Sequence, residues 1–152
     1  MILIVDFGSQ YNQLIARRVR ENRVYCQIEP PTISPEAVRR LNPKGIILSG
    51  GPASIYWKKS PKIDPDLFAL NIPVLGICYG MQVMIGALGG NVARADKREY
   101  GMAELTVLRA DGLFKGVDEH TPCWMSHGDS PSKLPPGFHA TASTTNRSEE
   151  RR

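Results

Sequence analysis

Long apolar runs are absent from this sequence. None reaches the roughly 18 residues that a membrane-spanning helix needs. The apolar residues 1–5 lead directly into Asp6, without the hydrophobic core and small-residue cleavage site of a secretory signal peptide. The sequence therefore predicts a cytoplasmic protein that does not contact membranes.

Cysteine is scarce, and its spacing excludes two kinds of site. The three cysteines, Cys26, Cys78 and Cys123, are far apart and form no C-x-x-C pair, so neither a zinc site nor a disulfide framework is predicted. Cys26 and Cys123 stand in apolar surroundings, where we expect small buried side chains. Cys78 has a different context, described below.

A concentrated basic stripe is also missing. The net charge is +4 and the pI is near 9.1, but Lys and Arg are spread along the chain, so nucleic acid is not a predicted partner. One local cluster holds Arg17, Arg18, Arg20 and Arg23. Acidic and apolar residues interrupt it, which is typical of a solvent-exposed helix face.

Short apolar runs alternate with helix-like segments in the first half of the chain. Residues 2–5, 24–28, 45–48 and 73–77 are predicted strands. Helical spacing follows the first strand, a Ser34-Pro35-Glu36 helix start follows the second, and a short helix at 65–70 precedes the fourth. This alternation predicts a doubly wound, flavodoxin-like α/β fold with a mostly parallel sheet and helices on both faces.

The pattern changes after Leu88, where Gly89 and Gly90 end the preceding helix. Residues 104–108, 121–125 and 138–141 are predicted strands of antiparallel or mixed structure. The chain has room for one domain, which we assign to residues 1–145. Residues 146–152 are all polar or charged, and we expect a disordered or foreign tail there.

The strongest chemical motif is Gly76-Ile77-Cys78-Tyr79-Gly80, where a buried strand meets a helix. This is the pattern of a nucleophile elbow, whose sharp turn leaves no space for side chains two positions before and after the nucleophile. At a helix N-terminus, the helix dipole and backbone N–H groups are expected to lower the pKa of the Cys78 thiol. The motif alone is also compatible with a buried core cysteine.

A second glycine-rich segment, Ser49-Gly50-Gly51-Pro52, follows the preceding predicted strand. Loops after parallel strands open onto the same sheet edge, so this segment is expected beside Cys78. Its glycines allow backbone N–H groups to approach a developing oxyanion closely, although an ordinary turn has the same composition.

Together with the 6–11 segment Asp-Phe-Gly-Ser-Gln-Tyr and the helix start Met81-Gln82, these motifs resemble a class I glutamine amidotransferase domain. The 6–11 segment, Lys-Arg-Glu-Tyr-Gly at 97–101 and Trp-Met-Ser-His-Gly-Asp at 124–129 are similar to the GMP synthetase members of that class. The resemblance extends from residue 2 to about 145 in unbroken motif order.

The resemblance implies a glutaminase in which Cys78 attacks the side-chain amide of glutamine and forms a glutamyl thioester. It implies an oxyanion hole made by the backbone N–H groups of Gly51 and Tyr79. Substrate contacts are implied for Gly50, Gln82, Ser126 and His127. Ammonia would pass to an ATP pyrophosphatase domain or subunit that aminates adenylated xanthosine monophosphate, using ATP and magnesium.

Two expected parts of such an enzyme do not occur in these 152 residues. The family's catalytic base lies in a His-Pro-Glu motif, which this sequence lacks, and no Ser-Gly-Gly-Val-Asp-Ser-like phosphate loop is present. Of the three histidines, His120 and His139 are expected at structural or surface positions, and His127 belongs to the substrate loop. We therefore expect no cofactor in this chain, no metal site and little activity from it alone.

Several alternatives stay open from sequence. The chain fits a gene fragment, a frameshifted reading of a longer gene or a shortened engineered form, and each leaves a C-terminally incomplete domain. A noncatalytic glutamine-pocket module that docks on a separate synthetase subunit is a second function. Another class I amidotransferase, such as one serving carbamoyl phosphate or anthranilate synthesis, is a third.

Overall fold

A computed structural model describes residues 1–144, except that the side chains of residues 95–100 and 126–128 lie outside the description. The chain divides into two compact units, Met1–Asn91 and Val92–Arg152. The boundary falls three residues after Leu88, where the sequence pattern changes. The tail predicted at 146–152 lies outside the described residues.

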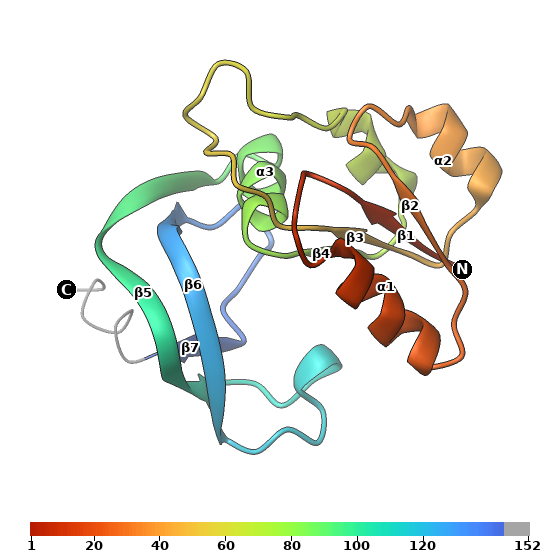
Figure 1. Ribbon diagram of the computed structural model, residues 1–152. Coiled ribbons are helices and arrows are strands. Elements are labelled where there is room, and N and C mark those ends of the chain that lie inside the picture. Colours follow the sequence, from red (N-terminus) through yellow and green to blue (C-terminus); the bar gives the residue numbers. More distant parts are fainter. Residues whose placement is uncertain (145–152) are drawn as a thin grey trace. The chain divides into compact units, whose positions relative to one another are not determined.

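The first unit contains a four-stranded parallel sheet (Figure 1). Its strands are β1 (Ile2–Val5), β2 (Cys26–Glu29), β3 (Gly45–Leu48) and β4 (Val74–Gly76). The spatial order is β2-β1-β3-β4, with β1 paired in parallel to β2 on one side and to β3 on the other. This order confirms the predicted doubly wound fold and places its switch point between β1 and β3.

Helices cover both faces of this sheet (Figure 1). The helix α1 (Asn12–Glu21) packs on one face through Ala16, which joins Ile4 and Cys26 in a buried cluster. The opposite face is covered by α2 (Pro35–Leu41), the 3₁₀ helix η1 (Pro65–Leu70) and α3 (Tyr79–Ala87). Since successive strand residues point to opposite faces, the central strands contribute to both clusters.

The start of α2 shows how local sequence sets an element boundary. The Ser34 side chain accepts a hydrogen bond from the Ala37 N–H at 3.2 Å, and Pro35 occupies the first helical position. Both features were predicted from the sequence. The helix ends at Asn42, which adopts the left-handed conformation.

The second unit contains a three-stranded sheet in the order β6-β5-β7. Its strands are β5 (Asn91–Val107), β6 (His120–Lys133) and β7 (Ala142–Thr144), and a 3₁₀ turn, η2 (Gly112–Phe114), lies between the first two. The strands β5 and β7 are antiparallel, as the changed sequence pattern indicated. Both β5 and β6 are longer than the predicted segments 104–108 and 121–125.

The predicted strand at 138–141 is wrong. The chain is still turning there, because Gly137 has a φ of 82° and the Phe138 N–H bonds back to the Pro135 carbonyl at 3.1 Å. Pairing with β5 begins only at Ala142, opposite Val107. The apolar residue Phe138 therefore belongs to a turn, although its spacing resembles that of a strand.

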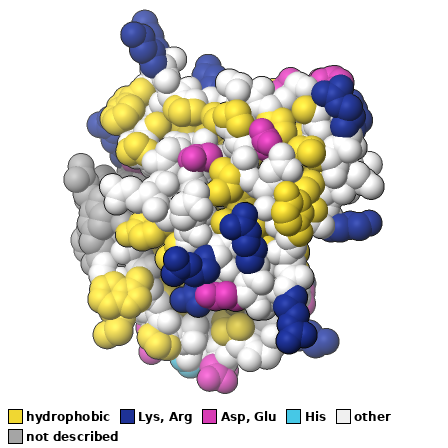
Figure 2. All heavy atoms as spheres, turned by 45° about the vertical axis from the view of Figure 1, so that its right-hand side comes forward, with side chains coloured by type: hydrophobic (Ala, Val, Ile, Leu, Met, Phe, Trp, Pro, Cys, Tyr) yellow, Lys and Arg dark blue, Asp and Glu magenta, His cyan; other side chains and the backbone are white. Residues whose placement is uncertain are grey.

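The surface agrees with the dispersed charge of the sequence. On the face shown in Figure 2, Lys and Arg side chains are scattered among acidic and hydrophobic ones. In α1, Arg17, Arg18 and Arg20 are exposed, and Arg18 pairs with Glu21 at 2.8 Å. Within the described part of the chain, no helix has the length and apolar character needed to cross a membrane.

Truncation of the core residue Leu3 tests the central position of β1. Leu3 is fully buried, so Leu3→Ala is expected to lower the free energy of unfolding by about 2–5 kcal/mol, through lost burial and a residual cavity. Urea denaturation measures this change. The matched variant Leu14→Ala, at a position 44% exposed in the same unit, should change it by only about 0.5 kcal/mol. Equal costs at both positions would contradict this packing.

Candidate active site

Cys78 occupies a strained turn between β4 and α3. Its φ of 48° and ψ of −113° lie outside the regions that residues with a side chain usually adopt. Such strain costs on the order of 1–3 kcal/mol and persists only where the surroundings hold it in place. Cys78 is also the residue that caps α3, and its side chain is exposed. The predicted nucleophile elbow is therefore present.

The two flanking glycines are required by close backbone contacts. A Cβ added to Gly76 would lie 2.6 Å from the Cα of Met81. A Cβ added to Gly80 would strike the carbonyl oxygen of Leu48. The first turn of α3 thus packs closely on the end of β4 at Gly76 and on the end of β3 at Gly80, which explains why neither position has space for a side chain.

Backbone hydrogen bonds fasten this turn to the end of β3. The Ile77 N–H donates to the Leu48 carbonyl at 2.9 Å, and the Gly80 N–H donates to the Ser49 carbonyl at 3.0 Å. Cys78 lies between these two donors, so its backbone has little freedom. The elbow is held by the neighbouring strand as well as by its own sequence.

The Gly50-Gly51 loop lies beside Cys78, as predicted. A Cβ built on Gly50 would be 3.5 Å from the Cβ of Cys78, which is ordinary contact distance. A Cβ on Gly51 would strike the carbonyl of Phe7, so the loop after β1 also packs here. Three loops therefore meet at the carboxyl ends of β1, β3 and β4, next to the switch point where doubly wound folds bind ligands.

The backbone and the side chain of Tyr79 make different contributions to the site. As the first residue of α3, its N–H belongs to the turn in which helix N–H groups have no acceptor within the helix. Its ring is buried and meets the Phe7 ring edge to face, with centroids 5.4 Å apart. Its hydroxyl donates to the Pro61 carbonyl at 2.7 Å, and burial raises the pKa of this phenol. The sequence did not indicate this anchoring role.

Ser49 is a second residue that sequence reasoning missed. Its side chain is fully buried at the end of β3. The hydroxyl accepts a hydrogen bond from the Phe7 N–H at 3.1 Å and donates one to the Gly50 carbonyl at 3.0 Å. The motif drew attention to its glycines, whereas a bond between residues 42 positions apart has no local sequence signal.

The remaining predicted substrate contacts have different outcomes. Gln82 is buried in α3, and its N–H donates to the Cys78 carbonyl at 3.1 Å. Ser126 and His127 fall within β6, and their side chains lie outside the described residues.

Asn12, at the start of α1, is buried, and its side-chain amide has no hydrogen-bond partner among the residues described. Sequence reasoning gave no role to Asn12.

Comparison with known proteins identifies the family. Residues 3–151 match the sequence profile described as "Glutamine amidotransferase class-I". The chain belongs to the class I glutamine amidotransferase family. The profile spans nearly the whole chain, and so includes the elbow, the glycine-rich loop after β3 and the second unit.

Curated relatives of this amidotransferase chain carry the name GMP synthase (glutamine-hydrolyzing). It is 57% identical over 143 residues to the protein of Heliobacterium modesticaldum and 56% identical over 145 residues to that of Caldanaerobacter subterraneus. These alignments cover 94% and 95% of this chain but 28% of each relative. The chain thus spans little more than a quarter of the length of the relatives it matches.

Solved structures show the same fold. A candidate GMP synthase component from Thermoplasma acidophilum is 28% identical and superposes with a TM-score of 0.81, covering 95% of this chain and 73% of its own. A glutamine amidotransferase from Thermotoga maritima is 18% identical, with a TM-score of 0.76 and coverages of 95% and 67%. The second likeness supports the fold alone.

The acidity of the amidotransferase thiol differs from the sequence-based expectation. A lowered pKa was expected from the helix N-terminus, but partial burial raises the pKa of the Cys78 thiol above its ordinary value. Desolvation disfavours the charged thiolate, and it is the sole cause of this shift. The fold therefore holds Cys78 in position and raises the pKa of its thiol.

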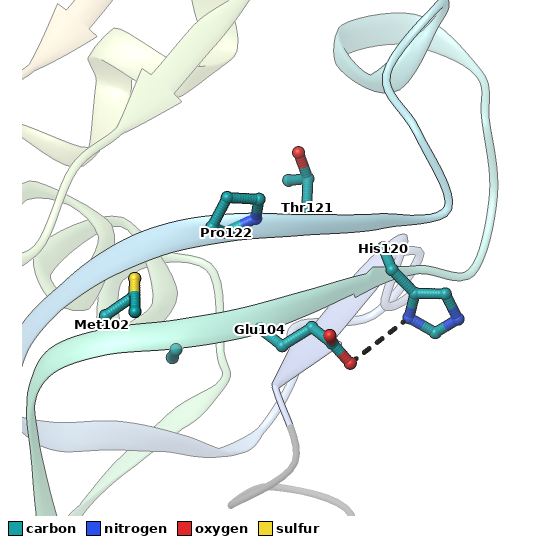
Figure 3. Close-up of a pocket in the computed structure, with 6 residues that line it drawn as sticks. Met102, Glu104, His120, Thr121 and Pro122 are labelled. Carbon is teal, nitrogen blue, oxygen red and sulfur yellow. Dashed lines mark ion pairs between the residues drawn. The ribbon is translucent and has the colours of Figure 1, made fainter.

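Two other groups of the amidotransferase occupy the expected positions, since Cys26 is buried and His139 is exposed. Cys123 was expected to be buried and is only partly buried. In the second unit, His120 Nδ1 lies 3.5 Å from Glu104 Oε1, beside an open hollow of about 240 Å³ (Figure 3). Both side chains are more than half exposed, so this pair contributes little stability.

Two glycines of α3 provide a matched test of the elbow. Gly80→Ala is expected to lower the free energy of unfolding by at least about 2 kcal/mol, because the added methyl group strikes the Leu48 carbonyl. Gly86→Ala adds the same group where nothing lies within 4 Å, and should raise stability by about 0.5–1 kcal/mol. Denaturant unfolding measures the free energy of unfolding of both variants. The packing of α3 on β3 is refuted by equal effects at both sites.

The raised pKa predicts how Cys78 reactivity depends on pH. Since the thiolate is the reactive form, alkylation by iodoacetamide should increase with pH through an inflection above that of a free cysteine, near 8.5. Alkylation resolved by residue in a mass spectrometer, with a cysteine peptide as reference, measures both inflections. An inflection below that of the peptide would show that the site activates the thiol.

Proposed function

We propose that this chain is the nucleophile-bearing part of a glutaminase that supplies ammonia within a GMP synthase. The observation that carries the proposal is the placement of an exposed cysteine on a strained elbow, with Gly50 so near that a Cβ added to it would contact the Cβ of Cys78. The names of curated relatives at 52–57% identity support the assignment to GMP synthase.

The proposed reaction consumes glutamine and water and produces glutamate and ammonia. The sulfur of Cys78 attacks the side-chain amide carbon, and the carbonyl electron pair moves onto oxygen. The N–H groups of Gly51 and Tyr79 stabilise this oxyanion, which is the role of an oxyanion hole in acyl transfer. When the intermediate collapses, the C–N bond breaks and nitrogen leaves as ammonia after taking a proton. Water then cleaves the thioester and restores the thiol.

The proposed substrate contacts include the elbow and the other residues predicted by resemblance. Gly50 borders Cys78 directly, and Gln82 lies one helical turn later. Ser126 and His127 are assigned to the same role by motif position. The contribution of this chain is binding, nucleophilic attack and oxyanion stabilisation.

Proton transfer is the step for which this chain has no assigned residue. A thiol nucleophile needs a base, and the pKa of Cys78 is raised. The 152 residues contain no His-Pro-Glu triplet, the motif that supplies the base in the family. We therefore expect a polypeptide of these residues alone to bind glutamine and to turn it over slowly.

The proposed acceptor of ammonia is an ATP pyrophosphatase domain or subunit that works in the cytoplasm on adenylated xanthosine monophosphate. ATP and magnesium belong to that partner in this proposal. It rests on the names of the longer relatives, of which this chain covers about 28%.

The proposal is tested by labelling with a diazo-ketone analogue of glutamine. We expect one adduct at Cys78, protection by free glutamine and no adduct in Cys78→Ala. Intact-mass and peptide analysis measure the adduct, and ammonia release measured in parallel should be low. Labelling that glutamine does not suppress would overturn the glutamine pocket, and rapid ammonia release would overturn the need for an external base.

A further inference from the structure

Ser49 makes two hydrogen bonds, one of which reaches the Gly50–Gly51 peptide of the proposed oxyanion hole. Its hydroxyl is fully buried at the end of β3 and has one acceptor and one donor bond. The Phe7 N–H occupies a lone pair of this oxygen, so its proton is directed to the Gly50 carbonyl. Ser49 itself has no exposed surface and cannot contact a substrate.

The Gly50 carbonyl belongs to the same peptide unit as the Gly51 N–H. A trans peptide is planar, and its C=O and N–H point in opposite directions. The described chain contains no cis peptide bond. Fixing the direction of the Gly50 carbonyl therefore also fixes the direction of the Gly51 N–H.

This peptide needs an external restraint because a glycine stands on each side of it. Glycine adopts positive and negative φ with similar ease, so rotation of the peptide by half a turn meets little steric resistance from its own residues. Gly50 lies against Cys78, and the contact of Gly51 with Phe7 leaves no space for a side chain. A side-chain hydrogen bond supplies the orientation that a bulkier residue would otherwise impose.

We infer that Ser49 is a positioning residue, whose hydroxyl holds the Gly50–Gly51 peptide with its N–H toward the oxyanion. This inference rests on the proposed glutaminase function. Phe7 extends the arrangement, since its N–H bonds to Ser49 and its ring contacts Tyr79, the residue that carries the second proposed donor. The buried Ser49 hydroxyl thus fixes the direction of the Gly51 N–H. Through Phe7 it is also linked to Tyr79, whose N–H is the second proposed donor.

The test uses the whole chain and a chloromethyl ketone analogue of glutamine. In this reaction the Cys78 sulfur first adds to the ketone carbon, and the carbonyl electron pair moves onto the ketone oxygen. The carbonyl then re-forms as the sulfur moves to the methylene carbon, chloride leaves, and the thiol proton passes to solvent. The ketone oxygen takes the place of the amide oxygen, so the maximal inactivation rate reports on the oxyanion hole. The concentration for half-maximal rate reports on binding, and iodoacetamide reports on the thiol without using the hole.

We expect Ser49→Ala to lower the maximal inactivation rate by about tenfold or more, compared with about 10²–10³-fold when an oxyanion donor is removed outright. The chloromethyl ketone concentration for half-maximal inactivation rate, and the rate at which iodoacetamide alkylates Cys78, should stay within about threefold of wild type. Ser34→Ala, which removes a helix-cap hydrogen bond outside the site, should leave all three values unchanged.

The outcomes separate this inference from the proposed function. If wild type gives no glutamine-protected adduct, the glutaminase proposal fails first. Suppose that wild type reacts. The positioning role is then overturned if Ser49→Ala keeps its full maximal inactivation rate, or if the maximal rate, the binding of the chloromethyl ketone and the iodoacetamide rate all weaken equally. Where Ser49→Ala does not fold, Ser49→Cys decides, because a thiol fills the space but donates weakly. It should show the same selective loss, and an unchanged maximal rate would refute the role.

Discussion

The arrangement of this site depends on one close backbone contact, the approach of Gly80 in α3 to the carbonyl at the end of β3. At that distance no side chain fits, and the Gly80 N–H reaches the Ser49 carbonyl. The contact fixes where α3 begins, and so holds Cys78 in a conformation that costs energy in an isolated chain. Stability contributed by the parallel sheet thus compensates for strain at the nucleophile.

The position of Cys78 and the acidity of its thiol are separate properties here. The loops after β1 and β3 place glycine backbone beside the thiol, and the side chains of Ser49 and Tyr79 tie the surrounding loops together through hydrogen bonds. Burial at the site disfavours the thiolate. A raised pKa lowers the thiolate fraction at neutral pH, and alkylation and oxidation both proceed through the thiolate.

Much of the fold followed from the sequence because local signals and tertiary packing agree. The apolar segments 2–5 and 45–48 are strands with the predicted bounds, and the elbow glycines were predicted from sterics. The strand expected at 138–141 was wrong because Gly137 turns the chain first. The roles of Ser49 and Tyr79 were missed because their partners, Phe7 and Pro61, are distant in sequence. The thiol pKa depends on desolvation, which requires the folded surroundings.

The strand order has a consequence for how the site forms during folding. The strand β1 lies between β2 and β3, and β4 joins at the outer side of β3, so the backbone support of the elbow is complete only when β4 has paired with β3. Closing such nonlocal pairings is slow relative to helix formation. Under the proposed function, glutamine-selective labelling of Cys78 during refolding is therefore expected only after β4 has paired with β3.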